Sequence, residues 1–201
     1  MAAEAADDAL VGYQADARRK ASQALDLGKD FDTRLAAVSA LTFSGDEARS
    51  DALLAGISRD YPDNQYLKTM GLPLAHAAVQ LQKNQFAEAI ATLETVRPYE
   101  FGNGLHAAGA TPVFFRGLTY LKMRDGVKAA AEFQRVLDHR GATGFDISYP
   151  LSRLNLARAY ALQGNVANAR TAYQDFFAMW KDADPDIPVL QQAHAEYDKL
   201  K

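Results

Sequence analysis

The chain has 201 residues, of which 48% are hydrophobic, and its 22 basic and 25 acidic side chains give a formal net charge of −3. This composition supplies a core and no basic field for a phosphate backbone, so we expect neither disorder nor direct nucleic acid binding. The absence of cysteine excludes disulfides, thiol chemistry and zinc-thiolate sites.

No apolar run approaches the roughly 18 to 20 residues of a membrane span, and the N-terminal letters MAAEAADD lack the basic and apolar parts of a signal peptide. We therefore expect a chain that is soluble as given, with no membrane segment. The compartment stays open between the cytoplasm, which we favour, and an extracytoplasmic tail of a membrane-anchored protein.

A pattern of four positions recurs along the chain with successive offsets of 3, 9 and 4 residues. The copies with this spacing are Val38, Leu41, Ser50, Leu54; Ala77, Gln80, Ala89, Leu93; Gly117, Tyr120, Ala129, Phe133; and Ala157, Tyr160, Ala169, Tyr173. A partial copy consists of Gly12, Ala17 and Ala24. Such self-similarity indicates an internal structural repeat.

Each copy has the pattern of a pair of amphipathic helices. Ala169, Ala172, Tyr173, Phe176 and Phe177 follow the i, i+3, i+4, i+7, i+8 spacing of one helix face. Short polar links are expected to separate the paired helices, and they lie at residues 44–46, 83–85, 124–126 and 163–165. In chain order, we predict a partial repeat at 1–30, full repeats at 31–63, 65–98, 111–139 and 148–181, and a capping helix at 186–200.

A glycine within a predicted helix needs a packing reason. Gly117 should cost roughly 0.5–1 kcal/mol relative to alanine. The equivalent residues Ala77 and Ala157 are also small, so we expect close approach of the paired helix, with Ala129 and Ala169 as the complementary small positions.

These residues resemble the tetratricopeptide repeat family, most closely in Ala157, Tyr160, the turn glycine Gly164, Ala169 and Tyr173. The resemblance implies one all-α domain, an α-solenoid of about four to five helical hairpins with a capping helix, whose first helices line a concave wall. The alanine or serine marker steps by 33, 39, 40 and 40 residues, longer after the first step than the family's period of about 34. The later junctions are therefore expected to carry longer loops.

Three segments, RPYEFG, AAEFQRVLDHRG and YQDFFAMWKDADPDIP, resemble the C-terminal repeat tails of bacterial serine/threonine protein kinases and of winged-helix transcription regulators. That resemblance implies a kinase-associated regulatory or sensory part of a larger signalling protein. The chain lacks the glycine-rich loop, the HRD motif and the DFG motif of the kinase itself, so no kinase activity is implied.

The longer loops cover residues 97–112 and 139–150. They are either spacers or, through Tyr99, Phe101, Phe145 and Tyr149, they close part of a binding groove or fold onto the first helices.

The concave wall implied by the resemblance is our predicted binding surface for a protein or peptide. Its candidate residues are Leu35, Ser39, Leu74, Ala78, Phe114, Leu118, Leu121, Leu154, Asn155 and Arg158. Relatives that clamp a peptide carboxylate use lysine, asparagine and arginine on this wall. Only Asn155 and Arg158 offer such polarity here, so we predict no carboxylate clamp.

We expect no catalytic residue, metal site or cofactor. The four histidines are scattered, and no nucleophile and base pair is evident. The run Asp182, Asp184, Asp186 begins like a calcium loop but has Ile187 and Ala193 where glycine and a carboxylate are needed. Two alternatives to peptide binding stay open: a homo-oligomerisation module, and a small-ligand sensor under the long loops.

Overall fold

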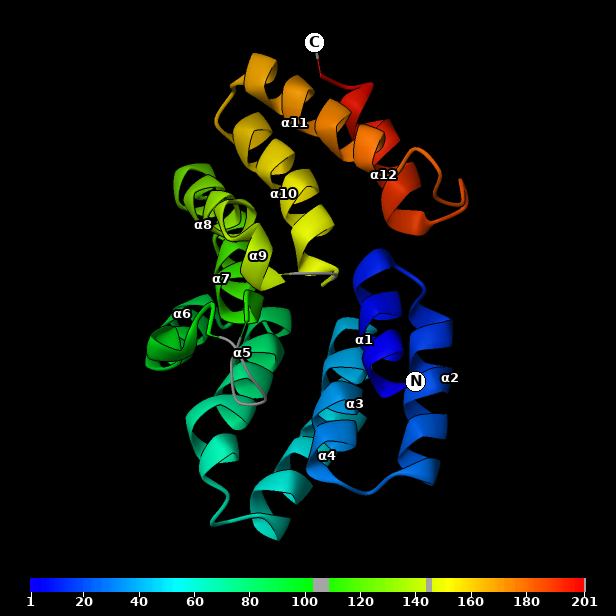
Figure 1. The fold of residues 1–201 in the computed structure, drawn as a ribbon, viewed down its shortest axis with the longest axis vertical. Coiled ribbons are helices and arrows are strands. Elements are labelled where there is room, and N and C mark those ends of the chain that lie inside the picture. Colours follow the sequence, from blue (N-terminus) through cyan, green and yellow to red (C-terminus); the bar gives the residue numbers. More distant parts are fainter. Residues whose placement is uncertain (103–108, 144–145, 201) are drawn as a thin grey trace. The chain divides into compact units, whose positions relative to one another are not determined.

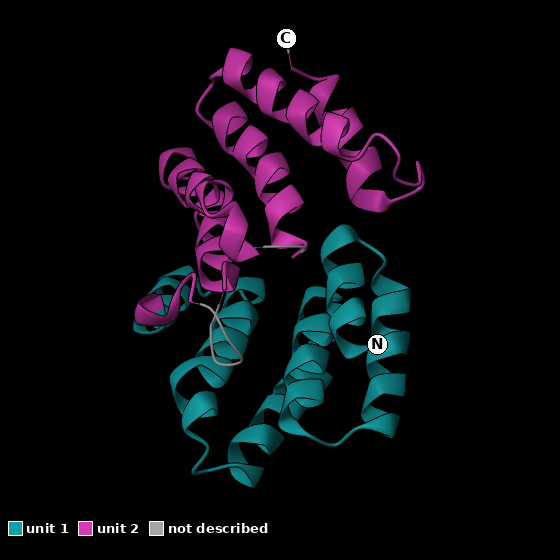
Figure 2. Cartoon of the chain, in the orientation of Figure 1, with its two compact units in different colours: residues 1–96 teal, residues 97–201 magenta. Residues whose placement is uncertain are grey.

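The computed structural model describes residues 1–102, 109–143 and 146–200 (Figure 1). Within these ranges the regular structure is entirely helical and contains no strand. The predicted all-α class is therefore confirmed. The chain divides into two compact units, residues 1–96 and 97–201 (Figure 2). A continuous solenoid across both units stays a prediction.

Unit 1 is built from consecutive helices that pack on their neighbours. The helices are α1 (Ala2–Val11), α2 (Gln14–Leu27), α3 (Phe31–Phe43), α4 (Glu47–Asp60), α5 (Leu72–Gln82) and α6 (Phe86–Thr95). A π-helical turn, Leu67–Gly71, leads directly into α5. Contacts join α1 with α2, α3 with α4, and α5 with α6, while α3 also contacts α1, α2 and α5.

Two apolar clusters form the core of unit 1. One centres on Val38, Ile57 and Leu67, and the other on Ala21 and Leu41. All five side chains are fully buried. Since removing such surface from water is the main favourable term in folding, these clusters fix the order in which the helices pack.

Unit 2 repeats the pairing of neighbouring helices. It comprises the 3-10 turn Arg97–Tyr99, then α7 (Thr111–Lys122), α8 (Gly126–Asp138), α9 (Arg140–Thr143), α10 (Ser148–Leu162), α11 (Val166–Met179) and α12 (Pro188–Tyr197). Helix α8 packs against α7 and α10, and α10 also packs against α11. Helix α12 lies within residues 186–200, the range of the predicted capping helix, and its capping role stays a prediction.

The polar links turn the chain in a common way. Gly45, Asn84, Arg124 and Gly164 have φ values of 80°, 59°, 60° and 72°, in the left-handed region. In three of these links the next residue is an N-cap. Asp46, Asp125 and Asn165 each accept a hydrogen bond from a first-turn backbone N–H. The links therefore end one helix and begin the next, as their composition predicts.

Gly117 lies at a close helix contact in unit 2. A β-carbon at this position would stand 2.6 Å from Cε1 of Phe133 on α8, so alanine does not fit without movement. The sequence led us to expect Ala129 as the complementary residue. The structure instead places the ring of Phe133 against the glycine. Ala129 on α8 and Ala157 on α10 are both fully buried.

Candidate functional site

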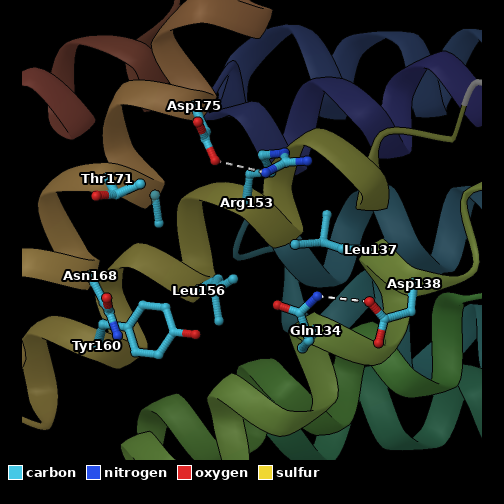
Figure 3. Close-up of a pocket in the computed structure, with 10 residues that line it drawn as sticks. Gln134, Leu137, Asp138, Arg153, Leu156, Tyr160, Asn168, Thr171 and Asp175 are labelled. Atoms are coloured by element: carbon cyan, nitrogen blue, oxygen red, sulfur yellow. Dashed lines mark hydrogen bonds and ion pairs between the residues drawn. The ribbon is translucent and has the colours of Figure 1, made fainter.

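Unit 2 has a groove of about 410 Å³ bordered by α8, α10 and α11 (Figure 3). We call it the α8–α10–α11 groove. Its lining residues are Gln134, Leu137, Asp138, Arg153, Leu156, Tyr160, Asn168, Thr171, Ala172 and Asp175.

Helical spacing explains why these side chains face one another. Asn168, Thr171, Ala172 and Asp175 lie at i, i+3, i+4 and i+7 along α11, and therefore share one face. The three groove residues of α8 lie at i, i+3 and i+4, and the three of α10 lie at i, i+3 and i+7. The groove is thus formed by one stripe from each of three helices.

The groove has an apolar base and polar edges. Leu156 and Ala172 are buried, whereas Gln134, Asp138, Asn168, Thr171 and Asp175 are exposed. A mixed lining of this kind supplies both area for apolar contact and groups that fix orientation.

Two polar pairs cross or border the groove. The Arg153 guanidinium donates to the Asp175 carboxylate at 2.9 Å, and the Gln134 amide donates to Asp138 at 2.8 Å. The lining of the groove therefore contains two carboxylates and one guanidinium, which give it a net charge of −1. The other polar side chains of the lining are Tyr160, Asn168 and Thr171.

A second polar arrangement joins α10 and α11 to α12. Arg158 donates to both oxygens of the Glu196 carboxylate, from Nε at 2.8 Å and from Nη2 at 3.1 Å. Arg158 Nη1 also donates to Asn155 Oδ1 at 3.1 Å, and the Tyr173 hydroxyl donates to Glu196 at 2.8 Å. We call this set the Glu196 contact.

The Glu196 contact changes the chemistry of Tyr173. Burial, followed by the hydrogen bond to the Glu196 carboxylate and its charge, raises the pKa of the Tyr173 hydroxyl well above its ordinary value. Tyr173 therefore keeps its proton and acts as a donor. Arg158 of the predicted wall is thus engaged by a carboxylate of α12, and Asn155 is engaged by Arg158 and by the Leu151 carbonyl.

A buried ion cluster anchors the segment after Tyr99 to α7 and α8. Arg116 is fully buried, and its Nη2 lies 2.6 Å from a Glu100 oxygen and 3.1 Å from a Glu132 oxygen. Arg135 pairs with both carboxylates, at 2.7 Å and 2.9 Å. Two cations and two anions balance in charge. We therefore assign the cluster a structural role, and it was not predicted from the sequence.

The predicted wall residues divide into two groups. Leu35, Ser39, Leu74, Leu118, Leu121 and Arg158 are half-buried. Ala78, Phe114 and Leu154 are buried at 0%, 2% and 0% exposure, and Asn155 at 4%. The three apolar residues are core side chains, because their apolar surface is used within the protein, and we correct their assignment to an open binding surface.

The predicted loop residues lie in different environments. The Phe101 ring stacks on His139 at 3.9 Å, and the Arg135 guanidinium lies 5.7 Å from its centroid. Phe101 thus packs at the end of α8, a second helix, and not on a first helix. Tyr99 is exposed, and Tyr149 lies 5.9 Å from the Arg140 guanidinium. Phe145 lies outside the described residues.

The signature residues are largely core. Gly117, Ala129, Phe133, Ala157, Ala169 and Tyr173 are buried, while Tyr120 is half-buried beneath the Lys128 ammonium and Gly164 is exposed in its turn. Tyr160, predicted as a structural marker, lines the α8–α10–α11 groove. The other groove residues were not predicted. The helical spacing of their polar members in the sequence nevertheless indicates helix faces that point away from the core.

Across residues 1–102, 109–143 and 146–200, no group of three or more histidine and carboxylate side chains is placed to hold a metal ion. In the same part of the chain, none of the helices combines the length and hydrophobicity needed to span a bilayer.

Comparison of the chain with family models, with curated proteins and with solved structures gave no match.

Proposed function

We propose that the chain is a non-catalytic interaction scaffold and that unit 2 receives an extended segment of a protein or peptide in the α8–α10–α11 groove. The observation that carries this proposal is the groove itself, with an apolar base and polar edges contributed by three helices. Fixed helices hold these side chains at set positions, which lowers the entropic cost of binding.

The length of the groove suits a short stretch of extended chain. From Asn168 to Asp175 along α11 is a step of seven residues, or about 10 Å at 1.5 Å per residue. Three residues of an extended peptide cover about the same length, at roughly 3.3 Å each. The groove therefore matches the contact length of a tripeptide within a longer segment.

The polar edges match a peptide backbone. The Asn168 amide and the Tyr160 hydroxyl can each donate and accept, as peptide N–H and C=O groups require. Leu137 and Leu156 offer apolar contact for one side chain of the segment. Asp138, the carboxylate of the lining that is not part of the Arg153–Asp175 pair, favours a lysine or arginine in the segment over an acidic residue.

The proposed site differs from the predicted concave wall, although the proposed role is the same. Three of the predicted wall residues are core, and the Glu196 contact occupies Asn155 and Arg158. The further proposal, that the chain is a regulatory or sensory part of a larger signalling protein, is supported by the sequence resemblance alone.

The test is a selection of random displayed peptides against the full chain, followed by calorimetry on the selected peptides. Asn168→Trp narrows the groove at an exposed position, and we expect it to weaken selected peptides at least about tenfold, or 1.4 kcal/mol. Gln192→Trp, an equally bulky change at an exposed position of α12, should leave binding unchanged. Peptides that bind the Asn168→Trp variant as tightly as the original chain would remove the groove from consideration.

Charge reversal tests the chemistry of the segment separately. Asp138→Lys should weaken peptides that carry lysine or arginine, because the carboxylate that attracts them is replaced by an ammonium. If acidic peptides dominate the selection from the start, the proposed charge preference is wrong even though a peptide site exists.

A further inference from the structure

A second pocket lies where α11 meets α12, outside the α8–α10–α11 groove. It has a volume of about 300 Å³. Its lining residues are Phe177, Trp180, Lys181, Ala183, Pro185, Leu190 and His194. We call it the Trp180 pocket, and its existence does not depend on the proposed function.

The walls of the Trp180 pocket are held by aromatic stacking. The rings of Phe177 and His194 are parallel to within 7°, with centroids 4.1 Å apart, and Trp180 packs on Phe176 at 4.9 Å. Contacts of this kind add to the energy of simple burial. The pocket is therefore formed before any ligand enters.

The link between α11 and α12 closes one side of the pocket. Gln191 donates from Nε2 to the carbonyl of Pro185 at 3.3 Å, and Ala183 donates its backbone N–H to the carbonyl of Trp180 at 3.1 Å. Ala183 and Pro185, the two small apolar residues of the link that line the pocket, are thereby fixed to the helices on both sides.

The lining is aromatic and aliphatic, with one permanent charge. Lys181 is 74% exposed, and its ammonium is 3.9 Å from the Asp182 carboxylate, which is 89% exposed. Such an exposed pair contributes little, so the ammonium can turn to a ligand at small cost.

The three carboxylates of the link oppose an anion in the pocket. Asp182, Asp184 and Asp186 are exposed and alternate with the residues that line it. They act through water and are screened, whereas Lys181 lines the pocket itself. The ammonium of Lys181, as the nearer charge, should therefore set the preferred charge of the ligand.

We propose that the Trp180 pocket binds a small aromatic carboxylate. The aromatic ring packs among Trp180, Leu190 and the Phe177–His194 stack, and the carboxylate meets the Lys181 ammonium. The volume lies at the lower end of the range for small-molecule sites, which fits a single-ring ligand. The sequence prediction of a small-ligand site under the loops at Tyr99 and Phe145 named a different place.

Trp180 is the only tryptophan, so its fluorescence reports on the pocket directly. The probes are phenylacetate, its neutral isostere 2-phenylacetamide, its cationic counterpart phenethylamine, and cyclohexylacetate, which lacks the aromatic ring. With the full chain, we expect phenylacetate to saturate with a dissociation constant on the order of 1 mM, as suits a ligand of this size. It should bind at least about fivefold tighter than the other three probes.

Variants then locate the site. Lys181→Ala should bind phenylacetate no better than 2-phenylacetamide, Lys181→Arg should keep the preference, and Lys122→Ala, at an exposed position of α7, should behave as the original chain. Ala183→Leu, which fills the pocket, should weaken all four probes. In a ¹H–¹⁵N spectrum, phenylacetate should move the indole signal of Trp180.

Several outcomes would overturn the proposal. If phenethylamine binds tighter than phenylacetate, the aspartates of the link set the ligand charge and the pocket does not take carboxylates. If phenylacetate leaves the emission and the indole signal of Trp180 unchanged up to tens of millimolar, the pocket is closed to such ligands. Equal binding by Lys181→Ala would show that the proposed cation plays no part.

Discussion

The ring of Phe133 lies so close to Gly117 that a β-carbon on the glycine would stand 2.6 Å from it. Both residues are buried, and each belongs to a different helix of the same pair, α7 and α8. The glycine, unfavourable for the helix alone, therefore permits the approach of the two helices.

Gly117→Ala should destabilise the chain by about 1–3 kcal/mol through overpacking against Phe133. Denaturant unfolding measures the change. Gly141→Ala is the matched control, because an added β-carbon there meets nothing within 4 Å, and its effect should stay within about 0.5 kcal/mol. Equal stability of Gly117→Ala and the original chain would mean that this helix contact is looser than the structure has it.

The link at Arg124 should be improved by glycine. Arg124 has a φ of 60°, a conformation that costs a side chain roughly 1–2 kcal/mol, and the equivalent residue of the next link is Gly164. Arg124→Gly should therefore raise the free energy of unfolding by up to about 1 kcal/mol, and Gly164→Ala should lower it by roughly 1 kcal/mol.

Thermal or denaturant unfolding of both variants checks this expectation. Lys122→Gly, two residues earlier and within α7, should lower stability by about 0.5–1 kcal/mol, because its backbone is helical. If Arg124→Gly also lowers stability, the left-handed backbone conformation of Arg124 does not cost the folded chain stability.

The free energy of unfolding at alkaline pH should depend on Tyr173. Its pKa is raised above the ordinary value near 10, first by burial and then by the Glu196 carboxylate. Above pH 10 the unfolded chain loses this proton while the folded chain keeps it, so stability is complete below pH 10 and falls as the pH rises beyond it. Tyr173→Phe should lose less stability than the original chain between pH 9 and pH 11, measured by denaturant unfolding at each pH. Parallel pH curves for the two proteins would contradict this assignment.

Much of the local structure could be predicted from sequence, because it depends on neighbours along the chain. The links at Gly45 and Gly164 combine a left-handed turn with the N-caps Asp46 and Asn165, and such turn chemistry is visible in the letters. The close helix contact at Gly117 could be predicted as well, although the side chain that contacts the glycine could not. Which second-helix side chain reaches the glycine depends on the axial offset of two helices.

The candidate sites depend on contacts between helices far apart in sequence, which no spacing rule specifies. The pairing of Glu100 with Arg116 and of Arg158 with Glu196 joins residues 16 and 38 positions apart. Arg116 lies in the apolar stretch PVFFRGL, and a charge in such a stretch was the one readable sign of a buried ion pair. The groove at Tyr160 required the faces of three helices to be brought together.

Acidic peptides with a free carboxylate should not bind at Arg158. A peptide ending in Glu-Glu-Val-Asp, titrated calorimetrically into the full chain, should show no binding tighter than about 1 mM. The reason is that Arg158 already donates to Glu196 from two of its three guanidinium nitrogens, Nε and Nη2, and to Asn155 from the third. Micromolar binding that Arg158→Ala abolishes would show that a peptide carboxylate displaces Glu196 from Arg158.

Removing the internal carboxylate should turn Arg158 into a site for an external one. Glu196→Ala should destabilise the chain by about 1.5–3 kcal/mol, because it removes charge-assisted hydrogen bonds from Arg158 and Tyr173. Acetate is small enough to take the place of the lost carboxylate, and a ligand that binds only the folded state raises its stability in proportion to RT ln(1 + [L]/Kd). Acetate at tens of millimolar should therefore raise the melting temperature of Glu196→Ala more than that of the original chain, whereas sodium chloride at equal ionic strength should not. Equal responses to acetate and chloride would mean that Arg158 is held by packing and not by the carboxylate.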